Sequence, residues 1–282
     1  MTCRMLVPPL LLLQFGFPSA QYSPDASVLV EAERAFARDA AENGTRAAFL
    51  AHMGEGSVVF EPGPVDARAT WEAREDRPGL LSWEPAHAAI AASGDMGFTT
   101  GPWEFRRGDS SEPPVAFGEY ATVWRKRADG SWRFAADIGI GHGPHAAPPG
   151  EPELDPVGPA ADVAATPAEV LAAERAFAKA AGEDLERAYR ERAWPGILLL
   201  REGASRAVGV DAAAPLAGRL PVEWQPSEVF VSAAGDLGYV YGTVRPTGDP
   251  DAAGYLRVWR RLPGGEWRIA LDVTTVPSPG GS

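Results

Sequence analysis

Two carboxylates in the first half of the chain, Asp137 and Glu33, are of a type and in a setting that could transfer a proton. A carboxylate held in an apolar hollow has a raised pKa and can act as a general base. Asp137 lies on a predicted strand, opposite the large apolar side chains; it lines a pocket if a bulge turns the strand and otherwise faces a domain interface. Glu33 borders the apolar stripe of a predicted helix, as a pocket acid or as a polar tie between helix and sheet.

Histidines offer a second kind of chemistry. His142 continues the core-facing side of the strand that begins at Trp132, so it would lie near one end of a pocket and could contact a polar ligand. His142 and His145 flank a Gly-Pro turn, but the sequence shows no evident third ligand for a metal ion. The only cysteine, Cys3, would leave with a cleaved leader, which excludes thiolate sites from the mature chain. We therefore expect no metal site and no cofactor.

The sequence segments that must position these residues occur twice along the chain. The segment "AERAFA" at 32–37 returns at 173–178, and "VWRKRADGSW" at 123–132 returns as "VWRRLPGGEW" at 258–267. The offset between the copies is 141 residues up to Gly101 and 135 residues from Tyr120 onward, so the second copy is six residues shorter in one loop. Such a repeat predicts that a whole domain was duplicated.

The repeat divides the chain of 282 residues into two domains of ordinary size. We predict the first domain at 25–142, a linker rich in Pro and Ala at 143–167, the second domain at 168–277 and a tail at 278–282. In each copy, residues with helical spacing come first, and strand-like segments separated by Gly-Asp, Asp-Gly or Gly-Gly turns follow. This order predicts an α+β fold with N-terminal helices packed on a curved, mainly antiparallel sheet.

The first 20 residues have the composition of a leader. Arg4 precedes an apolar run from Met5 to Leu13, and small residues end at Ala20. This pattern predicts a signal peptide cleaved near Ala20 and an exported protein, periplasmic or secreted; the alternative is a disordered or misassigned N-terminus. The apolar run is too short to span a bilayer. The formal net charge of −12 disfavours nucleic acid as a partner, because phosphate binding requires clustered Lys and Arg.

Each half of the chain resembles the nuclear-transport-factor-2-like superfamily, and within it the SnoaL-like and calmodulin-kinase-association-like domains of unknown function. The resemblance rests on "AERAFA", on "VVFEPGPV" after the helices and on "VWRKRADGSW". It implies two tandem cone-shaped domains, in each of which a curved sheet wraps helices and leaves a pocket at its open end. Because single-domain members pair through their sheets, it also implies either a monomer with an internal pseudo-dimer or a homodimer.

The resemblance implies a candidate catalytic residue as well. Isomerase-like members keep a general-base carboxylate before a proline at the end of the first strand, and this position matches Glu61, which precedes Pro62. Those enzymes also need a tyrosine from the first helix as a donor to the oxyanion, but this helix offers Phe36 and Ala37 near that position. Without such donors the isomerase chemistry loses its largest stabilising interaction.

The first copy is the better candidate for a ligand site because its predicted interior is more aromatic. Trp103 and Phe60 of the first copy correspond to Val244 and Arg201 in the second, and Glu119 corresponds to Gly254. The predicted ligand-binding residues are Phe60, Glu61, Trp83, Trp103, Tyr120 and His142.

Three functions remain open from the sequence. The first is the binding of a small apolar or amphipathic molecule in the cone of the first domain, without catalysis. The second is an isomerase- or lyase-type reaction with Glu61 or Asp137 as the base and His142 or Tyr120 as the donor. The third is a purely structural pseudo-dimer whose cones are filled by side chains. Ligand, reaction and oligomeric state are not readable from the residues alone.

Overall fold

A computed structural model of the chain describes residues 24–76, 78–148, 150–156, 158, 165–217, 222–246 and 253–277. The predicted signal peptide and C-terminal tail lie outside these residues. Within the described residues, no helix is both long enough and apolar enough to cross a membrane.

Three helices and eight strands build the first half of the molecule. The 17-residue helix α1 begins at Ser27, and its buried stripe of Leu29, Phe36 and Ala40 has helical spacing. Gly44 ends α1 with a φ of 92°, which a residue with a side chain rarely adopts. The elements are α1 (Ser27–Asn43), α2 (Thr45–His52), β1 (Met53–Phe60), β2 (Pro64–Asp66), α3 (Ala67–Ala73), β3 (Leu80–Trp83), β4 (His87–Ile90), β5 (Met96–Arg106), β6 (Ala116–Lys126), β7 (Trp132–His142) and β8 (Glu153–Leu154).

The second half repeats this order with a shorter set of strands. A proline at the helix start and a capping box between Thr166 and Glu169 begin α4. The elements are α4 (Pro167–Glu183), α5 (Leu185–Arg192), β9 (Ala193–Glu202), β10 (Ala207–Val208), α6 (Val210–Leu216), β11 (Val222–Val231), β12 (Leu237–Pro246), β13 (Ala253–Arg261) and β14 (Trp267–Pro277).

The two sheets have the same topology. The first sheet has the order β2-β1-β7-β6-β5-β4-β8, with β3 also paired to β5, and the second has the order β10-β9-β14-β13-β12-β11. In both sheets the first long strand pairs in parallel with the last strand of the meander, and the meander itself is antiparallel. The predicted α+β fold with two tandem helix-backed sheets is therefore confirmed.

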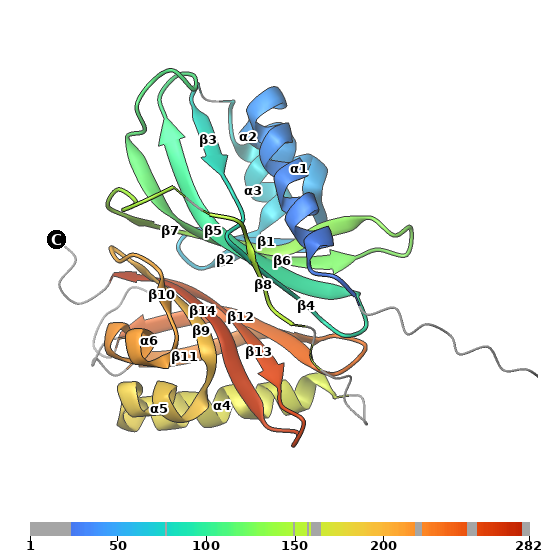
Figure 1. The fold of residues 1–282 in the computed structure, drawn as a ribbon, viewed down its shortest axis with the longest axis vertical. Coiled ribbons are helices and arrows are strands. Elements are labelled where there is room, and N and C mark those ends of the chain that lie inside the picture. The colour runs from blue at the N-terminus through green and yellow to red at the C-terminus, as the bar shows by residue number, and fades with distance from the viewer. Residues whose placement is uncertain are drawn as a thin grey trace, which may run out of the picture.

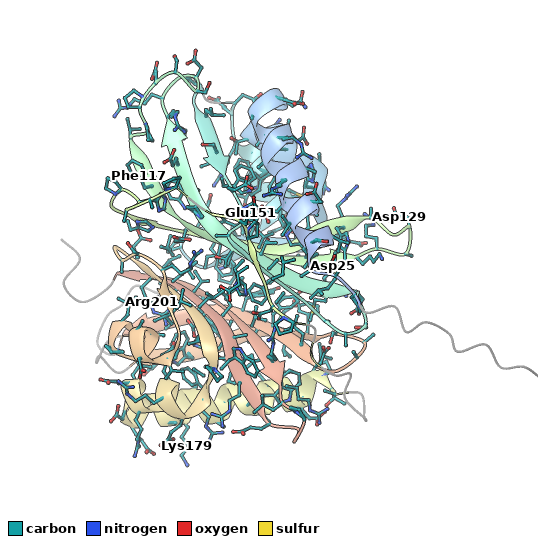
Figure 2. The ribbon with its side chains drawn as sticks, viewed as in Figure 1. Asp25, Phe117, Asp129, Glu151, Lys179 and Arg201 are labelled. Carbon is teal, nitrogen blue, oxygen red and sulfur yellow. The ribbon has the colours of Figure 1, made fainter. Side chains whose placement is uncertain are left out.

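The sheets pack back to back, and the helices lie on the outer faces (Figure 1). Side chains of both sheets fill the layer between them (Figure 2). One buried cluster spans this layer, with Ile138 and Val123 from the first sheet packed together with Leu256 and Leu271 from the second. Each sheet thus covers the apolar face that the other would leave exposed.

Each domain keeps a core of its own on the helical side of its sheet. Trp124 lies in the core formed with α1 and α2, whereas Trp259 lies in the core formed with α4 and α5. The two tryptophan-bearing hairpins therefore belong to separate hydrophobic cores, as duplication of a whole domain requires.

The segment before β5 forms two short strands, β3 and β4, rather than one continuous strand. The chain leaves the sheet between β3 and β4, and Gly101 of β5 lies under this break. A Cβ on Gly101 would lie 2.1 Å from the carbonyl oxygen of Glu84, and a Cβ on Gly242 would meet the corresponding oxygen of Gln225 at the same distance. Glycine recurs at this position because the backbone crosses too closely for any side chain.

The linker follows the edge of the first sheet rather than standing apart from it. Strand β8, which lies within 143–167, pairs in parallel with β4. Asp155, just after β8, lies 3.3 Å from His87 of the first domain and 2.6 Å from Arg260 of the second. The linker therefore connects the two domains through polar contacts as well as through the chain.

Candidate functional site

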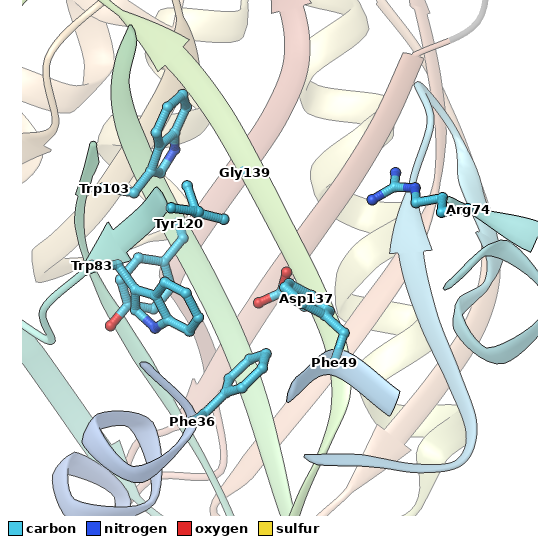
Figure 3. Close-up of a pocket in the computed structure, with 9 residues that line it drawn as sticks. Phe36, Phe49, Arg74, Trp83, Trp103, Tyr120, Asp137 and Gly139 are labelled. Carbon is cyan, nitrogen blue, oxygen red and sulfur yellow. The ribbon is translucent and has the colours of Figure 1, made fainter. Parts of the chain in front are cut away.

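A cavity of about 500 Å³ lies between the helices and the concave face of the first sheet. Figure 3 shows Asp137 at the middle of its sheet wall, with Tyr120 and Trp83 on one side and Phe36 and Phe49 from the helices below. The lining residues are Phe36, Phe49, Arg74, Leu81, Trp83, Trp103, Tyr120, Asp137 and Gly139. Trp83, Trp103, Tyr120 and Asp137 are thus sequence-predicted site residues that the fold brings together.

A β-bulge places Asp137 in the cavity. The register between β6 and β7 shifts between Val123 and Trp124. As a result, Phe134 faces the helices, whereas Ala136 and Ile138 face the second sheet. Asp137 consequently lies on the cavity side, which is the first of the two positions considered from the sequence. Its carboxylate accepts a hydrogen bond from the Thr122 hydroxyl at 2.8 Å. Burial nevertheless raises the pKa of Asp137 to about 6.

Tyr120 also lines this cavity. Its side chain is buried, and the hydroxyl has no hydrogen-bond partner within the described part of the chain. Burial, reinforced by the nearby Glu33 and Asp137 carboxylates, raises the pKa of Tyr120 well above its usual value, so the phenol stays protonated. A protonated phenol beside a carboxylate of raised pKa is a donor–acceptor pair, available to a ligand that carries a carbonyl or hydroxyl group.

Trp103 closes the end of the cavity. Its indole N–H lies 3.2 Å from the carbonyl oxygen of Glu119 and 3.1 Å from that of Ile140, and can donate to either. The ring occupies the space above Gly118, where a Cβ would lie 2.5 Å from it. Trp103 is therefore a fixed wall, because its polar atom is already satisfied by the backbone.

Glu33 is fully buried below the cavity, in contact with three strands. Its carboxylate accepts hydrogen bonds from the indole of Trp83 at 2.6 Å, the hydroxyl of Thr99 at 2.5 Å and the indole of Trp124 at 3.1 Å. Burial raises the pKa of Glu33 to about 7 despite these donors, and the nearby Asp137 carboxylate adds to the rise. Glu33 does not line the cavity, so it is the polar tie between helix and sheet rather than a pocket acid.

Three predicted site residues lie outside this cavity. Glu61 forms an ion pair with Arg74 at the surface, where its side chain is 44% exposed. Phe60 packs edge-on against Tyr241 of the second sheet, with ring centroids 6.4 Å apart. His142 lies on the opposite face of β7 from Asp137, because residues five apart on a strand point to opposite sides. These three residues were predicted to line the pocket, but none of them lines this cavity.

The equivalent space in the second domain is occupied by charged side chains. Arg257 is fully buried over the rings of Phe177 and Trp224, at 4.3 Å from each centroid. It pairs with Glu174 and, at 2.5 Å, with Asp272. These residues form a buried ion network on the helical side of the second sheet, where the first domain keeps its cavity.

Some cavity residues were missed by the sequence analysis. Phe36 and Phe49 come from α1 and α2, and their apolar spacing predicts core positions without revealing that both residues border a cavity. Arg74 follows α3, and its guanidinium lies 4.0 Å above the ring of Trp71. No local pattern marks Arg74 as a cavity residue, since the approach of the segment after α3 to the sheet is a tertiary contact.

Comparison with known proteins gives matches in fold. No family model and no curated protein matches the chain. The fold is similar to that of a ketosteroid isomerase-like protein from Erwinia carotovora atroseptica, with 22% identity over 40% of this chain and 97% of that one and a TM-score of 0.30. It is also similar to a nuclear-transport-factor-2-like protein of unknown function from Pseudomonas putida, with 17% identity over 39% and 86% and a TM-score of 0.33.

Proposed function

We propose that the first domain binds a small apolar or amphipathic molecule in the cavity between its helices and its sheet. The observation that carries the proposal is a space of about 500 Å³ with aromatic walls on which Asp137, Tyr120 and Arg74 converge. Cavities of this size, mainly apolar with a few polar groups, are typical of small-molecule sites. The aromatic walls would bury the apolar body of a ligand, and the polar groups would orient its single oxygen-bearing end.

Gly139 provides a direct way to test occupancy. It lines the cavity and is exposed to it, and a Cβ at this position would meet nothing closer than the Trp103 indole nitrogen at 3.7 Å. The substitution Gly139→Leu therefore fills the cavity without removing a native contact. We expect the fluorescent probe 1-anilinonaphthalene-8-sulfonate to bind the native chain and to bind Gly139→Leu at least tenfold more weakly.

The matched control is Gln225→Leu, which adds a leucine at an exposed position of β11 in the second sheet. It should leave the affinity for the probe unchanged. Equal binding by Gly139→Leu and the native chain would show that the probe sits elsewhere and would remove the main support for this function.

A second function, proton transfer next to a carbonyl group, is supported by one specific pairing. Asp137, with a pKa of about 6, and Tyr120, with an unpartnered hydroxyl, line the same cavity. A ketone whose oxygen accepts from Tyr120 would have its α-protons acidified, and Asp137 could remove one of them. Tyr120 would in this way supply the donor that the first helix lacks.

Exchange of deuterium into cyclohexanone in D₂O, followed by proton NMR, tests this second function. The native chain should accelerate the exchange above the buffer rate, and Asp137→Asn should abolish the acceleration while leaving probe binding intact. Tyr120→Phe should lower it by about two to three orders of magnitude, the usual effect of losing one oxyanion donor. Acceleration that survives in Asp137→Asn would exclude Asp137 as the base and leave binding as the function.

The proposal includes export of the chain. Its support is the sequence of residues 1–20, with an apolar run before small residues at the predicted cleavage point. Expression of the whole chain in a bacterial host, followed by fractionation and intact-mass measurement, should find a periplasmic form that begins near Gln21. An uncleaved form confined to the cytoplasm would contradict export without affecting the cavity.

A further inference from the structure

Three potential metal ligands meet on the face of the first sheet that is turned away from the cavity. Glu119 comes from β6, His142 from the end of β7 and His145 from the segment just after β7. Each of the three residues offers one ligand atom, and these three atoms all lie within 4.8 Å of one another. Glu119 is diagonal to His142 across the ladder, because His142 pairs with Phe117 in register. The sequence does not reveal Glu119 as the third ligand, because Glu119 is distant from both histidines along the chain.

Backbone contacts leave one nitrogen of each imidazole ready to bind a metal ion. Nδ1 of His142 lies 2.5 Å from the carbonyl oxygen of Gly143, and Nε2 of His145 lies 3.2 Å from the carbonyl oxygen of Trp103. A carbonyl oxygen can only accept, so each of these nitrogens carries the proton. The lone pairs of the neutral rings are then on Nε2 of His142 and Nδ1 of His145. Metal-binding histidines are commonly oriented in this way.

The lone pair of His142 has no partner of its own. Nε2 is buried and makes no hydrogen bond within the described residues, and the whole side chain is only 2% exposed. The nearest charged atom is Oε1 of Glu119, at 3.9 Å, beyond hydrogen-bond distance. A buried nitrogen without a donor costs about 1–3 kcal/mol, and a cation placed between the nitrogen and the carboxylate would satisfy both.

We propose that Glu119, His142 and His145 bind a divalent first-row transition metal ion such as Zn²⁺. Two imidazoles and one carboxylate are the donor set of sites that retain open positions for water or a ligand. To reach ligand distances of about 2.0–2.2 Å, the side chains must close in on the ion by roughly an ångström, which their torsions allow. The proposed metal site shares none of its three ligands with the cavity on the other face of the sheet.

The second domain supports this site. The backbone N–H of Gly141 donates to Glu202 at 3.0 Å, and its carbonyl oxygen accepts from the N–H of Gly203 at 2.7 Å. These two bonds fix the chain immediately before His142. Arg206 donates to Oε2 of Glu119 at 3.2 Å, which leaves Oε1 facing His142. The site is thus positioned by the domain interface.

An ion could reach the site from solvent. His145 lines a second cavity of about 510 Å³, together with Trp83, Pro102 and the segment 146–148. The second domain cannot form the same site, because Gly254 stands at the position equivalent to Glu119 and Pro277 at the position equivalent to His142. The proposal therefore specifies one ion per chain.

The test uses the untagged full chain, freed of metal by a chelator and titrated with Zn²⁺ in competition with a chromogenic chelator. We expect one Zn²⁺ per chain. Glu119→Gln, His142→Gln and His145→Gln should each weaken binding at least tenfold. Titration with Co²⁺ adds a readout independent of stability, since coordination by imidazole produces visible absorption bands that each variant should weaken or abolish.

His52→Gln is the matched control, because His52 also lies beside a carboxylate, 3.1 Å from Asp39, but outside the cluster. It should bind Zn²⁺ as the native chain does. Binding of no ion by the native chain would overturn the proposal. So would equal affinity in His142→Gln and His145→Gln, or an equal loss in His52→Gln. Circular dichroism of each variant ensures that a loss is scored only in a folded chain, and the three separate ligand variants keep the test decisive if one fails to fold.

Discussion

Arg257 in β13 and Thr122 in β6 occupy equivalent positions in the two sheets, and each contacts the aspartate of the following strand. Thr122 pairs in register with Asp137 and donates its hydroxyl at 2.8 Å, whereas Arg257 pairs in register with Asp272 and donates Nε at 2.5 Å. The larger residue fills the second domain with a buried ion network, and the smaller one leaves the first domain open. The two domains thus differ at this position in whether the space between helices and sheet is filled by a charged side chain.

The ion network should be essential to the second domain. Arg257→Met leaves Glu174 and Asp272 buried without their shared cation. Breaking a buried pair from one side costs about 3–5 kcal/mol, so we expect the free energy of unfolding to fall by that amount in urea titrations. The triple variant Arg257→Met, Glu174→Gln and Asp272→Asn should recover part of the loss.

The matched control for this prediction is Arg268→Met, which breaks an ion pair with Glu266 nearer the surface. A surface pair contributes about 0–1 kcal/mol, and the change should be correspondingly small. If Arg257→Met were no more destabilising than Arg268→Met, the buried ion network would not be what stabilises the second domain.

The stability of the first domain should depend on pH through Asp137. Its pKa is raised to about 6 in the folded chain from an ordinary value of 3.8. A carboxyl group with a raised pKa binds a proton more tightly when folded, so its stabilisation is present below the unfolded pKa and is lost as the pH rises through about 6. Asp137→Asn removes this dependence. Between pH 4 and pH 7, its free energy of unfolding should therefore rise by about 2 kcal/mol relative to that of the native chain.

Urea titrations of the native chain and Asp137→Asn at several pH values measure the difference. The exposed Asp76→Asn serves as a control for the general loss of one negative charge. If the free energies of unfolding of the native chain and Asp137→Asn differed by the same amount at every pH in this range, Asp137 would be solvated like a surface carboxylate. Glu33, with a pKa raised to about 7, adds a slope of the same sign in both proteins, and this slope is smaller in Asp137→Asn because the Asp137 charge contributes to the raised pKa of Glu33.

The layer between the sheets should stabilise the whole chain as one unit. Ile138 is 1% exposed and belongs to the cluster shared by both sheets. Ile138→Ala should cost about 2–5 kcal/mol, whereas Val115→Ala, at a side chain that is 50% exposed, should have little effect. Because each sheet covers the other, analytical ultracentrifugation should find a single-chain monomer. Unfolding in two separate transitions would contradict the shared layer.

Much of the fold could be predicted from residues that repeat. "AERAFA" and the tryptophan-bearing hairpins recur at fixed offsets, and local periodicity distinguishes their helices from their strands. Trp103 was a predictable cavity residue because the second copy has Val244 at the equivalent position, whereas Trp83 and Tyr120 recur in the second copy as Trp224 and Tyr255. Comparison of the two copies supplied this information.

The misplaced residues depend on features that a pattern does not contain. The bulge after Val123 reverses which side of β7 faces the helices, so parity counted from Trp132 places His142 on the wrong face. Glu61 follows the family position, but Arg74 holds it at the surface. Glu119 joins the two histidines only through strand pairing and packing of the second domain. Each of these is a tertiary relationship between residues far apart in sequence.

Arg206 provides the sharpest prediction about the proposed metal site, because it is the cation already beside Glu119. Its guanidinium lies 3.2 Å from the carboxylate and would repel an ion bound to the same group. Arg206→Gln should therefore tighten Zn²⁺ binding by roughly three- to tenfold, measured by the same chelator competition. Arg187→Gln, which removes an exposed arginine on α5, should leave the affinity unchanged. Weaker binding in Arg206→Gln would instead mean that Arg206 holds Glu119 in the orientation that receives the ion.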